Sequence, residues 1–432
     1  MRMKLNRFGQ LGLAAAASLI AAGTVTACGT LTVDFVYVTS SKAAGANNYG
    51  NVDVFEVNSE SGRLRQIPTS PFPSGGRDPV AEAVSPNFAN LYVVNQDDNN
   101  IVQFAIGNDG KLYPQNTINT PGIFPLAIAI NGSLLYVADT YQPLPTCSPA
   151  EPCPGSVAVF PLSSSGQPGT AVSNPNGDIN YWPLTAPHCP ANVITPSAIS
   201  AVHSGKYVFV AAYDTTAAAN DTASAPVSNG CDRNGAGTAP TGYVFAFAAA
   251  SNGVLTPVSG SPFVVEASGA NGIGVQPSAI ASDPGSGHIY VADFNGGKVY
   301  GYSVGSGTLE QLSGSPYGAG NQPAAITVDS AGAHAYVANS LDNTITAYTI
   351  TDGALSVFGT YPTSTQPVAI MVDPATDHFV YAANYLGSSV SGYQVLNSSG
   401  APSLVITQQT PYVANAQTTA MVGIPHGTQA SQ

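Results

Sequence analysis

The feature that most constrains this chain is a repeat of about 45 residues that runs through nearly all of it. A short apolar strand with a Tyr or Phe anchor recurs seven times, and neighbouring anchors in the regular copies lie 44 to 46 residues apart. The copies read YVTS, YVVN, YVAD, FVAA, YVAD, YVAN and YAAN, beginning at Tyr37, Tyr92, Tyr136, Phe209, Tyr290, Tyr336 and Tyr381. Such a period predicts an array of small equivalent units.

Two other segments recur in a fixed order with this strand. One is an alternating strand that runs into a turn containing Gly62, Gly110, Gly166, Gly253, Gly307, Gly353 or Gly400. The other is a strand of small residues, opened by Pro79, Pro125, Pro196, Pro277, Pro323 or Pro367 and, in a seventh version, by Thr418. Each unit has room for four short strands and their turns, which is typical of a propeller blade.

The order of the segments also predicts how the array closes. After the first 27 residues the chain begins directly with a Tyr-type strand, and Thr418 to Ile424 at the other end has no partner in its own unit. Pairing the two completes the first blade and removes an open sheet edge. We therefore expect an all-β, seven-bladed β-propeller over residues 28–432, with four-stranded antiparallel blades and a first blade closed by the C-terminal strand.

These motifs resemble those of a known family. The YVAN and YVAD strands, the QP-x-A-I strands and the Gly-Leu turns are similar to those of the YVTN-repeat, lactonase-type propellers, which include propeller-type 6-phosphogluconolactonases. The resemblance covers most of the chain after residue 27. It implies an enzyme in which water attacks a lactone carbonyl, helped by a carboxylate or histidine and by an arginine.

The first 27 residues predict an export signal. A basic start is followed by the short apolar stretch Leu11 to Ala22, which is too short to span a bilayer. The next segment, Val25 to Cys28, resembles the lipobox of bacterial lipoproteins, in which the cysteine becomes the lipidated N-terminus. We expect an exported protein anchored to the cell envelope through Cys28. The alternative is ordinary cleavage near Ala27, which would leave Cys28 as a free thiol.

Four cysteines follow Cys28, and an even number in an exported chain predicts two disulfides. Three pairings are open. We favour Cys147–Cys153, because these two lie close in sequence, and therefore Cys189–Cys231.

The charge of the chain limits its partners. Only 8% of residues are charged, and beyond residue 27 eight basic residues stand against 24 acidic ones, a net charge of −16. An acidic surface is a poor match for nucleic acid. No motif for a metal or a cofactor stands in a convincing context, so none is expected. The expected partners are the membrane, through the anchor, and a small lactone or an envelope protein or glycan; the protein is expected to be a monomer.

The long insertions predict which face carries a site. With the Pro-type strand innermost and the Tyr-type strand second in each blade, the insertions at about 140–155, 167–195 and 213–242 all fall on one face. They contain all four of these cysteines. Binding surfaces often form on long, disulfide-linked loops that a rigid scaffold holds in place.

The mouth of the central channel on that face supplies candidate ligand-binding residues. Gln276, Gln322 and Gln366 each precede an innermost strand. Their side chains either form hydrogen bonds to backbone groups between blades or form a polar ring that binds a ligand. His188 and Arg233 lie in the insertions, as surface residues or as groups that overhang the mouth.

Two residues break the repeat and are candidates for catalysis. Arg77 stands where other blades have uncharged residues, and Glu82 replaces an isoleucine such as Ile280 on an innermost strand. A carboxylate there is costly unless it is paired or hydrated. It therefore either pairs with Arg77, or sits at a kink facing the surface, or acts as general acid or base while Arg77 polarises a carbonyl. With His188, these residues make up the predicted catalytic set.

Two functions fit the sequence. The first is an exported lactonase that hydrolyses the ester bond of a non-phosphorylated lactone, because a phosphate would need more cationic contacts than this chain offers. The alternative is a non-catalytic envelope lipoprotein that binds a protein, peptide or glycan through its insertion-bearing face.

Overall fold

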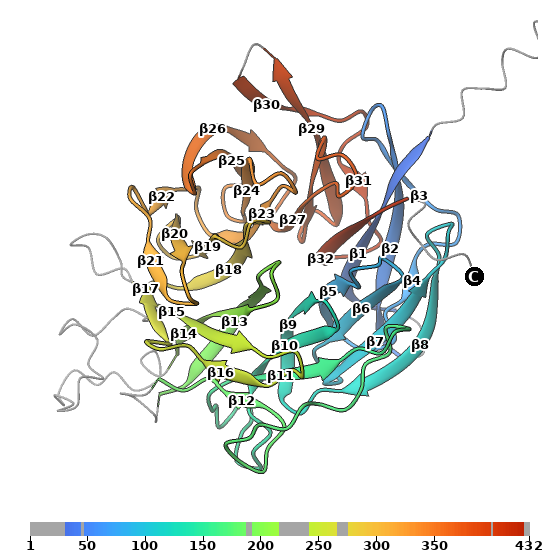
Figure 1. Cartoon of the computed structure of the whole chain (residues 1–432). Helices are drawn as coiled ribbons and strands as arrows, with labels where there is room; N and C mark the ends of the chain where they lie inside the picture. Colours follow the sequence, from blue (N-terminus) through green and yellow to red (C-terminus); the bar gives the residue numbers. More distant parts are fainter. Residues whose placement is uncertain are drawn as a thin grey trace, which may run out of the picture.

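The computed structural model describes residues 31–44, 47–186, 192–215, 242–265, 275–398 and 401–426. These residues form strands β1 to β32, which are arranged as seven antiparallel sheets around one axis (Figure 1). Among the described residues, no helix is long and apolar enough to cross a membrane. The all-β, seven-bladed fold predicted from the repeat is confirmed.

The strands follow the predicted order from the axis outward. The innermost strands are β32 (Thr418–Pro425), β5 (Pro79–Val84), β9 (Ile123–Asn131), β13 (Ile194–Ala201), β18 (Pro277–Ser282), β23 (Pro323–Val328) and β27 (Pro367–Val372). The second strands are β1 (Thr32–Ala44), β6 (Asn90–Asn95), β10 (Leu134–Tyr141), β14 (Tyr207–Asp214), β19 (His288–Asp293), β24 (His334–Asn339) and β28 (Phe379–Asn384).

The third strands are β2 (Tyr49–Asn58), β7 (Asn100–Ile106), β11 (Ser156–Pro161), β15 (Gly242–Ala249), β20 (Lys298–Val304), β25 (Thr344–Thr351) and β29 (Ser389–Ser398). The outer strand is continuous in β8 (Leu112–Asn119) and β26 (Ala354–Pro362) and short in β12 (Trp182–Pro183). In the other four blades it is split into β3 (Leu64–Gln66) and β4 (Phe72–Pro73), β16 (Leu255–Pro257) and β17 (Phe263–Val265), β21 (Leu309–Gln311) and β22 (Tyr317–Gly318), and β30 (Ala401–Ile406) and β31 (Tyr412–Val413).

The C-terminal strand closes the ring as predicted. β32 pairs antiparallel with β1, from Asp34 opposite Pro425 to Ser40 opposite Thr418. Figure 1 shows this red strand lying beside the blue first blade. The hydroxyl of Thr419 also donates to the carbonyl of Pro79, at 2.7 Å, which links the closing strand to the second blade.

The hydrophobic core consists of seven layers, one at each seam between neighbouring blades. Successive side chains of a strand point to opposite faces of its sheet. In β6, Val93 therefore packs with the first blade while Val94 packs with the third. This explains why the second strands are apolar throughout rather than alternating, since both of their faces are covered.

The repeated tyrosine and the repeated turn glycine meet across these seams. The hydroxyl of Tyr290 donates to the carbonyl of Gly353 in the next blade, at 2.9 Å, and Tyr381 donates to Gly62 at 2.7 Å. Tyr37 and Tyr92 make the same bond to Gly110 and Gly166. Gly62 has φ of 62°, and a β-carbon there would lie 2.2 Å from the ring of Phe379, so glycine is required. We refer to these contacts as the tyrosine clasps.

The long insertions are only partly described. Residues 142–155 connect β10 to β11, and their Cys147 and Cys153 are joined by the predicted disulfide. Cys189, Cys231, the signal segment and Cys28 lie outside the described residues, so their roles remain predictions. The division into a signal peptide and one propeller domain is likewise a prediction.

Candidate functional site

The candidate site is the channel mouth at the ends of the innermost strands where their first residues lie. The residue directly before the opening proline of each innermost-strand motif, or before Thr418 in β32, is Gln417, Asp78, Phe124, Thr195, Gln276, Gln322 or Gln366; Phe124 and Thr195 already lie within β9 and β13. The carbonyls of Gln322 and Gln366 each accept a bond of 2.8 Å from the turn that follows the second strand of the same blade. The repeat thus brings two segments of each blade together at the mouth.

The glutamines bond through their backbone rather than through their side chains. The backbone N–H of Gln276 donates to Asp293, at 2.9 Å, and that of Gln366 to Asn343, at 2.7 Å. Among the described residues, no hydrogen bond is formed by the side-chain amides of Gln276, Gln322 or Gln366, which are half-buried. Their amides are therefore available to a bound molecule, and their role as a polar ring that binds a ligand remains a prediction.

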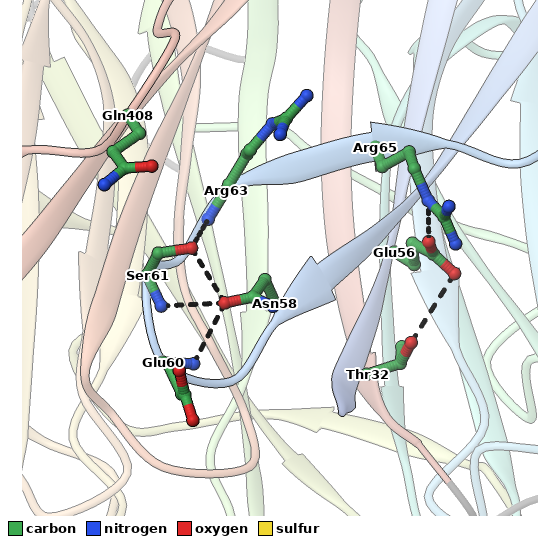
Figure 2. Close-up of a pocket in the computed structure, with 8 residues that line it drawn as sticks. All are labelled: Thr32, Glu56, Asn58, Glu60, Ser61, Arg63, Arg65 and Gln408. Atoms are coloured by element: carbon green, nitrogen blue, oxygen red, sulfur yellow. Dashed lines mark hydrogen bonds and ion pairs between the residues drawn. The ribbon is translucent and has the colours of Figure 1, made fainter. Parts of the chain in front are cut away.

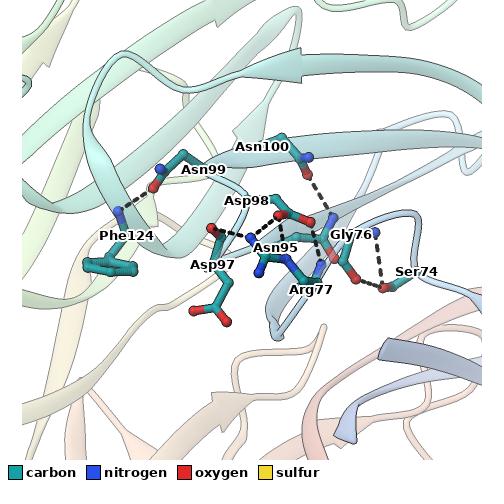
Figure 3. Close-up of polar contacts among 9 residues, drawn as sticks. All are labelled: Ser74, Gly76, Arg77, Asn95, Asp97, Asp98, Asn99, Asn100 and Phe124. Carbon is teal, nitrogen blue, oxygen red and sulfur yellow. Dashed lines mark hydrogen bonds and ion pairs between the residues drawn. The ribbon is translucent and has the colours of Figure 1, made fainter. Parts of the chain in front are cut away.

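Arg77 lies in the segment before β5 and is held by an aspartate of the next turn. Its Nε donates to Oδ1 of Asp98 at 2.7 Å, and its backbone N–H donates to Oδ2 at 2.8 Å (Figure 3). Burial tends to raise the pKa of Asp98, but the bonds from Arg77 outweigh it and lower that pKa below its usual value. Half of the Arg77 side chain remains exposed. The guanidinium is thus fixed in position while still facing solvent.

The sixth blade contains an uncharged version of the same contact. Asn321, which corresponds to Arg77, donates to Asp342 through its backbone at 2.7 Å and through its side chain at 2.8 Å. The aspartate that holds Arg77 is therefore part of the repeated architecture. What is special to the second blade is that this contact presents a positive charge.

Asp78, directly after Arg77, carries a second polar group to the mouth. Its backbone has φ of 52°, and its carbonyl accepts a bond from Gln96. Burial, and then the negative charge of Asp97, raise the pKa of the Asp78 carboxyl. A raised pKa moves a carboxylate toward the range that suits a general base. Asp78 is absent from the catalytic set predicted from the sequence, although its place beside Arg77, where other blades have glutamine, is a usable signal.

Glu82 occupies a different environment from Arg77. It lies opposite Val93, just as Ile280 lies opposite Val291, and both of its carboxyl oxygens are buried without a hydrogen-bond partner among the described residues. Burial raises its pKa to about 8, and the nearby backbone of Val422 in β32 offsets only part of the rise. The group is therefore mostly protonated at neutral pH.

The structure does not pair the two predicted catalytic residues. The ion pair of Arg77 is with Asp98, and the charge of Glu82 acts on Tyr37 of the first blade. Glu82 is thus enclosed at the seam between the first two blades, neither paired with Arg77 nor turned to the surface. His188 and Arg233 lie outside the described residues. A catalytic role for Glu82 or His188, and a ligand-binding role for Arg233, remain predictions.

Two exposed leucines lie at the mouth in the sixth and seventh blades. Leu341 and Leu386 follow the second strands of the sixth and seventh blades, at the position that Asp97 holds in the second, and are 60% and 59% exposed. The backbone N–H of Leu341 donates to the carbonyl of Asn321. On either side of Leu386, the backbones of Tyr385 and Gly387 bond to the segment before β27. These bonds place the two leucines beside the glutamine segments. The mouth therefore carries the charged Arg77 and its acidic neighbours in the second blade, and exposed apolar side chains among polar ones in the sixth and seventh.

Comparison with known proteins identifies the architecture further. Residues 49–144 and 307–417 match the model of the family described as "Lactonase, 7-bladed beta-propeller". These two segments match the lactonase-type propellers. No curated protein matches the chain.

Solved structures of lactonase-type propellers share the fold at low sequence identity. A Bacteroides fragilis protein, proposed by name to be a 6-phosphogluconolactonase, has a TM-score of 0.68 and 16% identity, with 92% of this chain and 99% of that chain covered. The periplasmic gluconolactonase of Pseudomonas aeruginosa has a TM-score of 0.67 and 16% identity, with 91% and 99% covered. At such identities the similarity shows the fold alone.

The remaining polar repeats of this propeller have structural partners. Asp293, at the end of β19, accepts bonds from the backbone of Gln276 and Asn295. On the other face, His288 and His334 bond through Nδ1 to Asp283 and Asp329, at 2.8 and 2.7 Å. Among the described residues, no group of three or more His, Cys, Asp or Glu side chains could hold a metal ion.

Proposed function

We propose that this lactonase-type propeller hydrolyses a non-phosphorylated lactone bound at the channel mouth. The observation that carries the proposal is the exposed Arg77 guanidinium, which Asp98 holds in place beside Asp78. The family match and the lactonase names of the structural relatives support the reaction class. Fold alone does not fix function, so the proposal depends on these side chains.

The two side chains have complementary roles in the proposed reaction. Asp78 takes a proton from a water molecule as the oxygen of that water forms a bond to the lactone carbonyl carbon. Arg77 stabilises the negative charge that develops on the carbonyl oxygen. The ring C–O bond then breaks, and the leaving alkoxide takes the proton from Asp78. The products are one carboxylic acid, which releases its proton to solvent as it ionises, and one hydroxyl on the same molecule.

The composition of the mouth favours a lactone without a phosphate. Among the described residues that flank the innermost strands, Arg77 is the cationic side chain, while Asp78 and Asp97 are acidic neighbours. A phosphate is usually held by several charge-assisted bonds, which this environment does not offer. Leu341 and Leu386 instead favour a lactone with an apolar substituent, since such a group would be removed from water there.

The test is a panel of sugar lactones and acylated homoserine lactones, measured with the wild type and with Arg77→Ala and Asp78→Asn. We expect kcat/KM to fall about 100-fold or more in each variant, a size typical of losing an oxyanion donor or a general base. The matched control is Asn321→Ala, which removes the same contact from the sixth blade and should retain wild-type activity. A wild type inactive on every lactone, or equal losses in all three variants, contradicts the proposal.

We also propose export and anchoring through Cys28, on the basis of the N-terminal sequence. Palmitate labelling that is present in the wild type and absent from Cys28→Ala is the expected result. Labelling of both forms, or of neither, counts against the anchor.

A non-catalytic envelope protein is the second candidate function. The disulfide-closed loop between β10 and β11, which lies on the same face as the mouth, is the observation that favours it. Inactivity of the wild type on the whole lactone panel, together with retention of an envelope glycan or protein on the purified chain, would favour this candidate.

A further inference from the structure

A second polar pocket lies away from the mouth, at the seam between the first and seventh blades (Figure 2). It has a volume of about 410 Å³ and is formed by the end of β2, the turn into β3, and Gln408, which follows β30. β2 has ten residues, so about 30 Å separates this end from the end at the mouth. The pocket is therefore distinct from the proposed catalytic site.

The turn that forms one wall of the pocket is held rigidly. Oδ1 of Asn58 accepts bonds from the backbone of Glu60, at 3.2 Å, and from the backbone and hydroxyl of Ser61, at 2.9 and 2.7 Å. The carbonyl of Gly62 is in turn held by the clasp from Tyr381 in the seventh blade. A preformed wall lowers the entropic cost of binding a small molecule.

The pocket concentrates positive charge in a chain that has little of it. Arg63 and Arg65 both line it, and they are two of the eight basic residues after position 27. Arg65 is paired with Glu56. The guanidinium of Arg63 makes no ion pair within the described part of the chain, and Figure 2 shows it pointing away from Asn58 and Glu60. Arg63 is thus able to pair with an anion from outside.

The other lining groups indicate what the rest of that ligand is. All eight lining side chains are polar or charged, and none is aliphatic or aromatic. Gln408 can donate and accept hydrogen bonds, whereas Glu56 and Glu60 can only accept when ionised. Ionised acceptors suit hydroxyl donors and repel a compact, highly charged anion such as phosphate. The set therefore matches a molecule with one carboxylate and several hydroxyls.

We propose that this pocket binds a hydroxylated carboxylic acid, such as a uronic or aldonic acid, with its carboxylate on Arg63 and its hydroxyls on Glu60 and Gln408. The volume falls within the range of about 300–1,000 Å³ that small-molecule pockets span. The proposal does not depend on the proposed hydrolysis at the mouth.

Calorimetric titration of the full chain with glucuronate, gluconate, glucose and inorganic phosphate tests it. We expect the two acids to bind, glucose to bind at least tenfold more weakly, and phosphate not to bind. Arg63→Gln should weaken binding of the acids by tenfold or more. The matched control, Lys206→Gln, removes the same charge from an exposed site in the fourth blade and should leave binding unchanged.

Three outcomes overturn the proposal. They are no binding of either acid to the wild type, equal weakening in Arg63→Gln and Lys206→Gln, and phosphate binding as tight as that of the acids. Thermal unfolding of each variant establishes that it is folded, and Arg65→Gln provides a second variant on the same wall if Arg63→Gln is unstable.

Discussion

At the scale of single residues, three carboxyl groups are buried in unusual surroundings. Asp34, Glu82 and Asp139 are enclosed, and burial is the main cause that raises the pKa of each to about 8. Their oxygens have no hydrogen-bond partner within the described residues. A buried carboxyl in such surroundings is tolerated because it keeps its proton rather than its charge.

We predict that stability falls as pH rises because of these groups. Between pH 4.5 and about 8 the folded state keeps the proton on Glu82 while the unfolded state has lost it, so the free energy of unfolding decreases with pH. Replacement by Met, the residue at the equivalent position in β32, should reduce the fall between pH 5 and pH 8 by about 2–4 kcal/mol. Urea unfolding at both pH values measures this.

The control for this prediction is Glu310→Gln, at an exposed position in β21. The same pH dependence in wild type and Glu82→Met would show that the Glu82 carboxyl is hydrated or ionised in the folded state.

At the scale of the elements, the tyrosine clasps explain two of the three repeated signatures. The tyrosine belongs to a second strand and the glycine to the turn between the third and outer strands of the next blade, so neither residue acts within its own unit. The two signatures recur together because the hydroxyl on one side of a seam bonds to the close-fitting turn on the other. The fourth blade has Phe209 in place of the tyrosine and therefore lacks the hydroxyl.

We predict that Tyr290→Phe destabilises the protein by about 1–2 kcal/mol, since it leaves the buried carbonyl of Gly353 without its donor. Tyr113→Phe, at a 43% exposed position in β8, is the matched control and should change stability by less than about 0.5 kcal/mol. Urea midpoints of the two variants give the comparison. Equal midpoints would mean that the clasp contributes nothing beyond the packing of the ring.

At the scale of the whole molecule, strand β32 closes the ring by completing the first blade. β32 pairs with β1 and also contacts the innermost strands of the neighbouring blades. Removing it would expose the edge of β1 and the apolar seams on both sides. A propeller open at one blade has unpaired edges that favour aggregation.

We predict that deletion of residues 418–432 abolishes cooperative unfolding and produces an aggregating chain. A shorter deletion, of residues 427–432, keeps β32 intact and should unfold like the wild type. Adding a peptide of residues 418–426 to the longer deletion should restore part of the cooperative transition. A longer deletion that unfolds like the wild type would contradict closure by this strand.

The sequence predicts the ring better than it predicts the site. The fold follows from motifs that recur seven times, because each motif residue makes the same contact in several blades. The site depends on residues that occur once. Glu82 could be located on an innermost strand, but whether its carboxyl enters a seam or the mouth depends on the packing of β5 against β32.

Arg77 illustrates the same limit. Its partner Asp98 lies 21 residues further on, in a turn of ordinary composition. The sequence signal was the equivalent pair Asn321 and Asp342, which becomes visible only when the two blades are aligned residue by residue. A side chain that occurs in only one blade has no equivalent in the other blades to compare it with. Its partner therefore has to be found in the structure.

The direction of β1 determines how the protein would be oriented if its N-terminus were anchored to a membrane. β1 starts at Thr32, beside the Arg63 pocket, and runs toward Ser40, which pairs with the strand that begins at the mouth. A lipid on Cys28 would be four residues from that start, a span of about 14 Å at most. The molecule would then rest with the Arg63 pocket near the bilayer and the channel mouth pointing away from it, toward freely diffusing molecules.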